Sequence, residues 1–419
     1  MKILLIDHPQ FTSATYFLWQ GLKELEELYA EHLSVSCYPY IPTNYDEDEF
    51  NLKDLAWFNW LDELTKQGAA SLPYGIPPFH PDERLTSRGE TLMRRGAPWK
   101  KFGKNNIISD EASVIMELEK HGFDLVVLGN SHRVPTILLS RLKERVKNFP
   151  PVVYLDAGER DELNEHWIHV FRPDLVFKQI LTPEVKALGL SVPIQGYTLR
   201  MYPLPLSSPL VDQENVSVEG LSLQWLRMNS KKSPKMIPIF YWMGNTWPAR
   251  ERVLQALDEL VVRRDLPRIK GCSYLNYNFA LAKSRMGITM RGSGRDTTRY
   301  WEIPFYKTAM ISDGTMGCIH PYPFEHGKTA FFYRSVDELI RIIEEHLTEE
   351  GAPAEELHRV ALAGMEHLER YHSTAARAVF FLDVLKRELG LTDPGIEIAL
   401  EQWKGRKQWT ERPWEGPVV

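Results

Sequence analysis

Residues 290–302 read MRGSGRDTTRYWE, and this stretch decides the fold that we expect. It follows an apolar run at residues 286–290, which predicts a buried strand. The polar residues after Gly294 predict the start of a helix, and Gly292 and Gly294 let the backbone of the turn approach a ligand closely. A strand, a glycine turn and a helix in this order form an α/β unit whose ligand site lies at the carboxyl end of the strand.

The composition of this turn favours a site for a diphosphate. Arginine forks bind phosphate oxygens in pairs, hydroxyls donate further hydrogen bonds, and helix-start N–H groups attract anions. Glu302 lies one to two turns into the helix, where a carboxylate can accept hydrogen bonds from both hydroxyls of a ribose. The residues behind this prediction are Arg291, Gly292, Ser293, Gly294, Arg295, Asp296, Thr297, Thr298, Arg299 and Glu302. A glycine-rich surface turn with solvated arginines is the alternative, and composition alone does not separate the two.

Apolar runs alternate with amphipathic helices on both sides of this turn. Strands are predicted at residues 2–6, 123–128, 152–155 and 175–178, and again at residues 236–241, 286–290, 310–312 and 329–332. Such alternation is typical of an α/β fold with parallel sheets covered by helices on both faces. Residues 203–219 are rich in Pro and Ser without a clear period, which predicts a linker between two domains.

The run RGSGRDTTRYWE is followed by AMISD at residues 309–313 and by PFEHGK at residues 323–328. Together these segments resemble the C-terminal domain of GT-B glycosyltransferases, closest to the CgeB-like and exostosin-like group. The resemblance covers residues 235–385 and is only architectural over the first 200 residues. It implies two Rossmann-like domains that face a cleft, with a nucleotide-sugar donor in the second domain and an acceptor in the first.

The resemblance also implies boundaries for the parts of the chain. We expect an N-terminal acceptor domain at residues 1–210 with an insertion at about 38–106, and a donor domain at residues 211–392. Residues 393–419 are expected to be a tail that packs back on the N-terminal domain. The insertion and the tail hold many of the chain's 12 Trp, 17 Tyr and 18 Phe residues.

Site residues are carried over one by one. Glu302 takes the ribose-binding position, while Arg291 and the turn of Asp296, Thr297 and Thr298 take the diphosphate and sugar side. Gly244 and Asn245 match a glycine turn after the first strand of the donor domain, and Arg250 is a further phosphate candidate. Many retaining members have a second glutamate eight residues before the ribose glutamate. Gly294 stands there, so we expect inversion.

An inverting transfer needs a general base near the acceptor hydroxyl. His8 follows the first predicted strand and titrates near neutrality, which makes it the first candidate. Asp156, after the third predicted strand, is the second, ahead of His132, Glu159 and Asp161. A packing or capping role stays open for each of these residues.

The same resemblance implies that no metal and no tightly bound cofactor is needed, and that a nucleotide-diphosphate sugar, UDP-linked by expectation, is a co-substrate. Asp46, Glu47 and Asp48 form a D-x-D pattern, but they do not follow a predicted strand, so a solvated acidic loop is the preferred interpretation.

The composition excludes several classes of protein. The 419 residues hold 50 Lys and Arg against 56 Asp and Glu, a net charge of −6, which argues against a surface coated by nucleic acid. Three cysteines fit neither a zinc site nor a disulfide framework. No run reaches the roughly 18 apolar residues that a bilayer span needs, and the first apolar run is too short for a signal peptide. We expect a cytoplasmic protein without a membrane span.

Two other functions stay open. Basic residues interleaved with aromatics at residues 94–104 would suit a glycosyltransferase that acts on DNA bases or another nucleic acid. A non-catalytic module that binds a nucleotide sugar would keep the same signature. The acceptor, whether a glycan, a small molecule or a modified nucleic acid, and the oligomeric state do not follow from the sequence.

Overall fold

The structure is a computed structural model. It describes residues 1–7, 13–39, 111–129, 136–157, 168, 172–185, 200–207, 217–218, 221–222, 235–243, 248–267, 274–292, 295–314, 317–348, 350–391 and 393–409. The insertion expected at 38–106 lies almost wholly outside the described residues, and so do residues 410–419 of the expected tail.

The first half of the chain builds a parallel sheet in the order β2-β1-β3-β4-β5-β6. Its strands are β1 (Lys2–Asp7), β2 (Ser34–Pro39), β3 (Leu125–Gly129), β4 (Val152–Asp156), β5 (Leu175–Lys178) and β6 (Met201–Pro203). Strands β1, β3, β4 and β5 are short, largely apolar runs whose side chains are buried on both faces, as is typical of parallel sheets. The helices of this half are α1 (Ser13–Leu28), α5 (Glu111–Glu119) and α6 (Thr136–Arg145).

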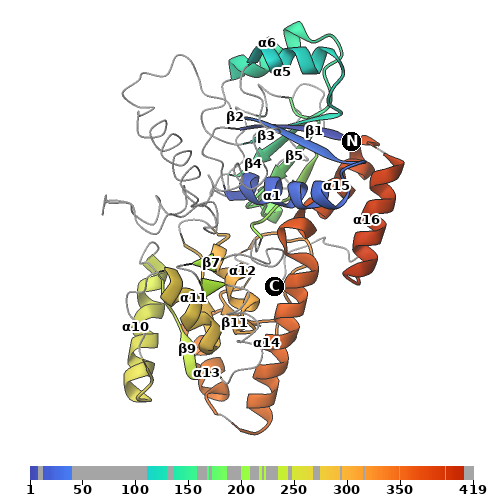
Figure 1. Ribbon diagram of the computed structural model, residues 1–419. Coiled ribbons are helices and arrows are strands. Elements are labelled where there is room, and N and C mark those ends of the chain that lie inside the picture. The colour runs from blue at the N-terminus through green and yellow to red at the C-terminus, as the bar shows by residue number, and fades with distance from the viewer. Residues whose placement is uncertain are drawn as a thin grey trace.

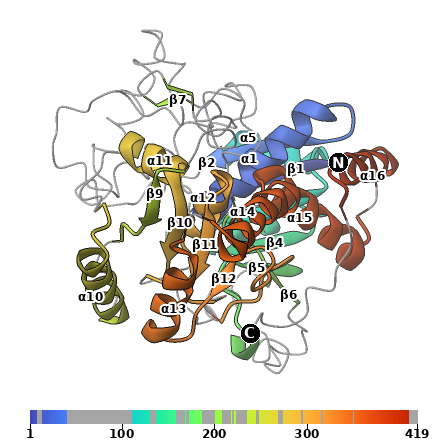
Figure 2. The ribbon, with the colours of Figure 1, turned by 90° about the horizontal axis from the view of Figure 1, so that it is seen from below.

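The second half builds another parallel sheet, in the order β12-β11-β10-β9. Its strands are β9 (Ile237–Phe240), β10 (Ser284–Thr289), β11 (Ala309–Ser312) and β12 (Phe331–Phe332), and Figure 2 shows them side by side. The helices are α10 (Pro248–Arg263), α11 (Tyr274–Lys283), α12 (Thr298–Phe305) and α13 (Val336–His346). Along the chain between β6 and β9, β7 (Ser217–Val218) and β8 (Leu221–Ser222) form a small antiparallel pair. The expected α/β class with two parallel sheets is confirmed.

The chain crosses back to the first sheet earlier than the expected tail. Helix α14 (Ala352–Tyr371) belongs to the second half, but α15 (Thr374–Leu389) packs against α1 and lies beside the first sheet (Figure 1). The Phe381 ring lies 4.8 Å from that of Phe177 on β5. At Gly21 of α1, an added Cβ would come 2.0 Å from the carbonyl oxygen of Thr374, so only glycine permits this approach. The crossing therefore starts before residue 392, the expected end of the donor domain.

A capping residue sets the break between α14 and α15. Ser373 has an extended backbone, and its side chain accepts a hydrogen bond from the amide of Ala376, as N-cap serines do. The far end of α15 stops at Gly390, which has the left-handed conformation that glycine adopts without strain. The cap at Ser373 begins α15 and the cap at Gly390 ends it. Helix α15 is therefore separate from its neighbours, although the apolar pattern alone would join it to α14.

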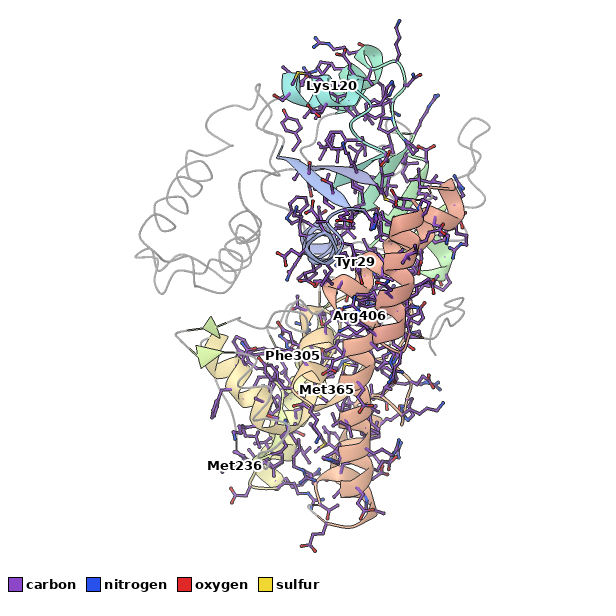
Figure 3. All side chains as sticks on the ribbon, turned by 45° about the vertical axis from the view of Figure 1, so that its right-hand side comes forward. Tyr29, Lys120, Met236, Phe305, Met365 and Arg406 are labelled. Carbon is purple, nitrogen blue, oxygen red and sulfur yellow. The ribbon has the colours of Figure 1, made fainter. Side chains whose placement is uncertain are left out.

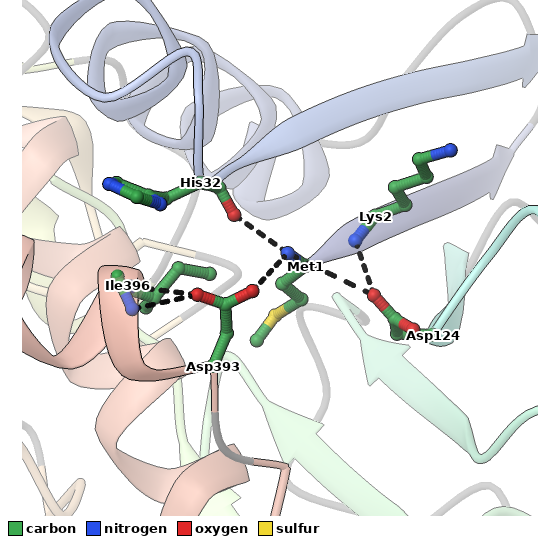
Figure 4. A network of polar contacts seen from close by, with 7 residues as sticks. Met1, Lys2, His32, Asp124, Asp393 and Ile396 are labelled. Carbon is green, nitrogen blue, oxygen red and sulfur yellow. Dashed lines mark hydrogen bonds and ion pairs between the residues drawn. The ribbon is translucent and has the colours of Figure 1, made fainter.

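Helix α16 (Pro394–Arg406) then packs on the first half of the molecule. Asp393 caps it by accepting hydrogen bonds from the amides of Gly395 and Ile396 at 2.9 and 3.1 Å, and the same carboxylate lies 3.2 Å from the backbone nitrogen of Met1 (Figure 4). At its other end Arg406 donates to the hydroxyl of Tyr29, and Figure 3 labels both residues. These contacts join α16 to Met1 at the start of β1 and to Tyr29 just beyond α1.

None of the described helices is long and apolar enough to cross a membrane.

Candidate functional site

The carboxyl ends of the second sheet bring four separate segments to one edge. Because β9 to β12 are parallel, the residues that follow them all leave the sheet on the same side. Trp242 follows β9, Arg291 follows β10, Asp313 follows β11 and Tyr333 follows β12. The first turn of α12, preceded by Thr297, starts at the same edge, so its N–H groups add a partial positive charge.

Arg250 braces the turn after β10 from the first turn of α10. Its Nε donates to the carbonyl oxygen of Arg291 and its Nη2 to that of Met290, both at 2.8 Å. The side chain is only 5% exposed. Burial and the nearby Arg299 lower its pKa, and Asp313 opposes this decrease. Arg250, which was predicted as a phosphate candidate, thus holds the backbone of the turn. Together with Arg299 it places positive charge next to this turn.

Asp313 is a site residue that sequence reasoning missed. Its carboxylate accepts hydrogen bonds from the backbone amide of Arg291, at 3.1 Å to Oδ2 and 3.3 Å to Oδ1. Burial raises its pKa to about 6, although these hydrogen bonds and the Arg291 charge favour the ionised form. The available signal was its place after a strand of small and apolar residues.

Glu302 and Tyr277 form a second polar pair at this edge. Oε2 of Glu302 accepts a hydrogen bond from the Tyr277 hydroxyl at 2.8 Å. Burial raises the pKa of Tyr277 well above its usual range, Glu302 raises it further, and the nearby Arg299 opposes the increase. Glu302 therefore lies where the sequence placed it, on α12. Tyr277 comes from α11, a helix that the sequence did not predict.

The remaining predicted donor residues are divided between described and undescribed parts of the chain. Thr297 lies before α12 with its hydroxyl 3.4 Å from that of Thr289, and Thr298 is exposed. Gly292 is buried in the turn. The predictions for Gly244, Asn245, Ser293 and Gly294 lie outside the described residues.

Asp296 differs from the expectation because its carboxylate bonds inside the protein. Oδ2 accepts from the amide of Leu206 at 2.6 Å and Oδ1 accepts from Nε1 of Trp301 at 2.9 Å. Arg377 of α15 donates to the carbonyl oxygen of the same Leu206 at 3.3 and 3.4 Å. Burial lowers the pKa of Arg377 to about 9, and Asp296 opposes this decrease. Asp296 thus links the turn after β10 to Leu206, which follows β6 of the first sheet. Through Leu206 it is also linked to Arg377 of α15.

Asp156, the second candidate base, does not lie at this edge. Asp156 ends β4 on the other sheet, where Oδ2 accepts a hydrogen bond from Lys178 at 2.9 Å. The Asp156 and Lys178 side chains are 2% and 1% exposed, so the pair is buried. In this structure the Asp156 carboxylate is thus engaged by the Lys178 ammonium. His8 lies outside the described residues.

Within the described part of the chain, no group of three His, Cys, Asp or Glu side chains is arranged to hold a metal ion.

Residues 226–383 match the family described as glycosyl transferase-like, which is less than half of the chain. No curated protein sequence matches the chain. Among solved structures the chain is similar to a glycosyltransferase from Rickettsia africae ESF-5, at 13% identity over 93% of this chain and 99% of that one, with a TM-score of 0.52. It is also similar to an alpha-glucosyltransferase (AGT) in complex with UDP, at 10% identity over 92% and 100% and a TM-score of 0.49. A third similar structure is HepE of Anabaena in complex with UDP, at 11% identity over 92% and 100% and a TM-score of 0.46.

Proposed function

Because residues 226–383 match a glycosyl transferase-like family and the fold is similar to that of a known glycosyltransferase, we propose that this protein is a GT-B glycosyltransferase that moves a sugar from a nucleoside diphosphate sugar to an acceptor hydroxyl. The observation that carries the proposal is the meeting of Arg250, Arg291 and Arg299 with Glu302 at one edge of a parallel sheet. Cations fixed at a helix start suit a diphosphate, and a carboxylate beside them suits the hydroxyls of a ribose.

The parts of this edge have separate tasks in the proposed donor complex. The diphosphate lies against the turn at Arg291 and the first turn of α12, where positive charge also stabilises the leaving group as the glycosidic bond breaks. Arg250 keeps the carbonyl oxygens of this turn away from the phosphates by bonding them itself. Glu302 accepts hydrogen bonds from the ribose.

Thermal shifts with UDP-, GDP-, ADP- and TDP-sugars test the donor proposal. A ligand that binds only the native state raises the melting temperature, and a UDP-sugar is expected to do so. Glu302→Gln should lose most of this shift. Glu344→Gln changes a half-exposed carboxylate on α13 that pairs with Arg263, and it should retain the shift. The absence of a shift with every nucleotide sugar would overturn the proposal.

The transfer step is proposed to invert the anomeric centre without a metal, because Gly294 replaces the second glutamate of retaining relatives. His8 is then the first candidate for the base, since Asp156 is paired with Lys178. The anomer of the product, read by NMR, tests inversion, and activity that chelator abolishes and Mn²⁺ restores would contradict metal independence. If His8→Ala and Asp156→Ala both keep near-normal turnover, neither residue is the base.

A further inference from the structure

We propose that Trp242 and Tyr277 form the nucleoside end of the donor site. The Trp242 ring stacks on the nucleobase, and the Tyr277 hydroxyl orients the Glu302 carboxylate toward the ribose. This inference rests on the proposed function and states which end of the donor lies at which part of the edge. Tyr277 acts through Glu302, so it is a positioning residue.

Trp242 offers an aromatic face at the edge of the sheet. It lies two residues beyond the end of β9 and is 39% exposed. Of the large apolar side chains that stay exposed in the described part of the chain, it is the one tryptophan. Its ring centroid is 5.6 Å from that of Tyr277, with the planes tilted by 56°. Such a ring, supported behind by a second one, is a suitable platform for a planar ligand.

Tyr277 joins this platform to the carboxylate. It is 4% exposed and packs edge-on against Phe240 of β9, with the ring centroids 5.3 Å apart. A buried tyrosine hydroxyl needs a hydrogen-bond partner, and this one donates to Oε2 of Glu302. The bond fixes one carboxylate oxygen and thereby the direction of the other. Ring contact and hydrogen bond place Trp242, Tyr277 and Glu302 in one continuous row.

The row continues into the cationic part of the site. Arg299 lies near the Tyr277 hydroxyl, Arg250 lies near Arg299, and Asp313 near Arg250 marks the far side. The order along the edge is therefore aromatic ring, carboxylate, then arginines. A nucleoside diphosphate has its groups in the same order, namely base, ribose and phosphates. This match selects the nucleoside, rather than the transferred sugar, as the group on Trp242.

Calorimetric titration of Trp242→Ala tests the platform. Removing a stacking ring should weaken both UDP and UDP-glucose by about tenfold, and Trp242→Phe should restore most of the affinity. Phe279→Ala is the matched control, because Phe279 is 47% exposed on α11 without a described ring contact to Trp242. Unchanged UDP affinity would overturn the platform, and so would a loss confined to UDP-glucose, which would place the sugar there.

The positioning role of Tyr277 is tested by comparing UDP with 2′-deoxy-UDP. The wild-type protein should prefer UDP because Glu302 accepts from the 2′-hydroxyl, and Tyr277→Phe should lose much of that preference while it keeps the ring. Tyr306→Phe is the control, since it removes a buried hydroxyl that bonds Asn278 instead. An unchanged preference in Tyr277→Phe would overturn this role alone. A wild-type protein that binds no nucleotide would overturn the proposed function as well.

Discussion

At the scale of single residues, burial has a large effect on the pKa of His320. Its ring lies 5.7 Å from that of Tyr300 and 5.6 Å from that of Trp301, and neither ring nitrogen has a hydrogen-bond partner in the described part of the chain. Burial and, to a smaller extent, the charge of Arg377 lower its pKa to about 3. Between about pH 3 and pH 6.5 the folded protein therefore holds this histidine neutral, whereas the unfolded chain would protonate it.

This shift predicts a loss of stability in mild acid. Between pH 6.5 and pH 3 the unfolded chain binds a proton at His320 that the folded chain refuses, so stability falls as the pH falls through this window. His320→Phe should reduce the loss between pH 7 and pH 5 by about 2 kcal/mol. Denaturant unfolding at both pH values measures it, with the exposed His121→Asn as the control. Equal pH dependence in wild type and His320→Phe would contradict the prediction.

The raised pKa of Asp313 predicts that ligand affinity, unlike stability, increases as the pH falls. Its raised pKa, about 6, means that it takes up a proton as the pH falls below neutrality. A neutral Asp313 repels a diphosphate less, so the affinity for UDP-glucose, which does not titrate here, should rise about threefold from pH 7.5 to pH 5.5. Asp313→Asn should bind with little pH dependence and resemble the wild type at low pH. Calorimetry at the two pH values decides, and a slope that survives in Asp313→Asn would exclude this carboxyl as its source.

The sequence placed part of the candidate site and missed the rest for a physical reason. Arg291 and Glu302 follow directly from the order strand, turn, helix, which is local in the chain. Tyr277 and Trp242 join Glu302 only because α11 packs beside β9, and no short-range pattern encodes that contact. The hydrogen bond between Asp296 and Leu206 could not be predicted either, because these two residues lie 90 residues apart in the chain.

At the scale of elements, the close contact of α1 with α15 depends on a missing side chain. A methyl group at Gly21 would overlap the backbone of Thr374, which cannot rotate out of the way. We therefore expect Gly21→Ala to lower the free energy of unfolding by about 3 kcal/mol despite the better helix propensity of alanine.

Gly405→Ala gives the matched control for that measurement. Gly405 also lies in a helix, α16, but an added Cβ would meet nothing within 4 Å. This variant should be neutral or slightly stabilising. Thermal melts of the two variants side by side check the prediction, and a Gly21→Ala melting temperature equal to that of Gly405→Ala would show that the helices can separate without cost.

Most strands of the two parallel sheets could be predicted, and the two exceptions, β2 and β6, share a cause. The strand predicted at residues 175–178 has the observed bounds, and those of β4, β10 and β11 shift by a residue or two. In contrast, β2 reads SVSCYP, with polar residues in alternation, and β6 is three residues long and ends in proline. Both strands are held by pairing with a neighbour, β1 or β5, rather than by their own apolar character.

At the scale of the whole molecule, the resemblance to GT-B glycosyltransferases is confirmed. One set of contacts around Leu206 joins the two halves. Asp296 and Arg377 both bond the backbone of Leu206, one at its amide and one at its carbonyl oxygen. The second sheet's turn and the crossing helix are thus fixed on the same residue of the connecting chain. The orientation of the turn after β10 therefore depends on the contact between the two halves.

Breaking this joint should affect stability and binding together. Asp296→Ala leaves the Leu206 amide, the Trp301 indole and the Arg377 cation with fewer partners, so we expect a loss of about 3 kcal/mol of stability. UDP-glucose affinity should fall as well, although Asp296 bonds no ligand in this arrangement. Glu397→Ala, which removes an exposed ion pair with Lys386, is the control. Calorimetry that finds full donor affinity in a destabilised Asp296→Ala would separate the joint from the site.

The crossing of α15 has a consequence for exchanging halves between such proteins. Its residues complete the hydrophobic core around α1 and β5, so by packing they belong to the first half although they follow the second in the chain. A chimera that takes a foreign donor half must therefore be spliced twice, once in the connection after β6 and once near Ser373. Recombination at a single junction would mismatch an inherited core surface, whichever parent supplied the helix.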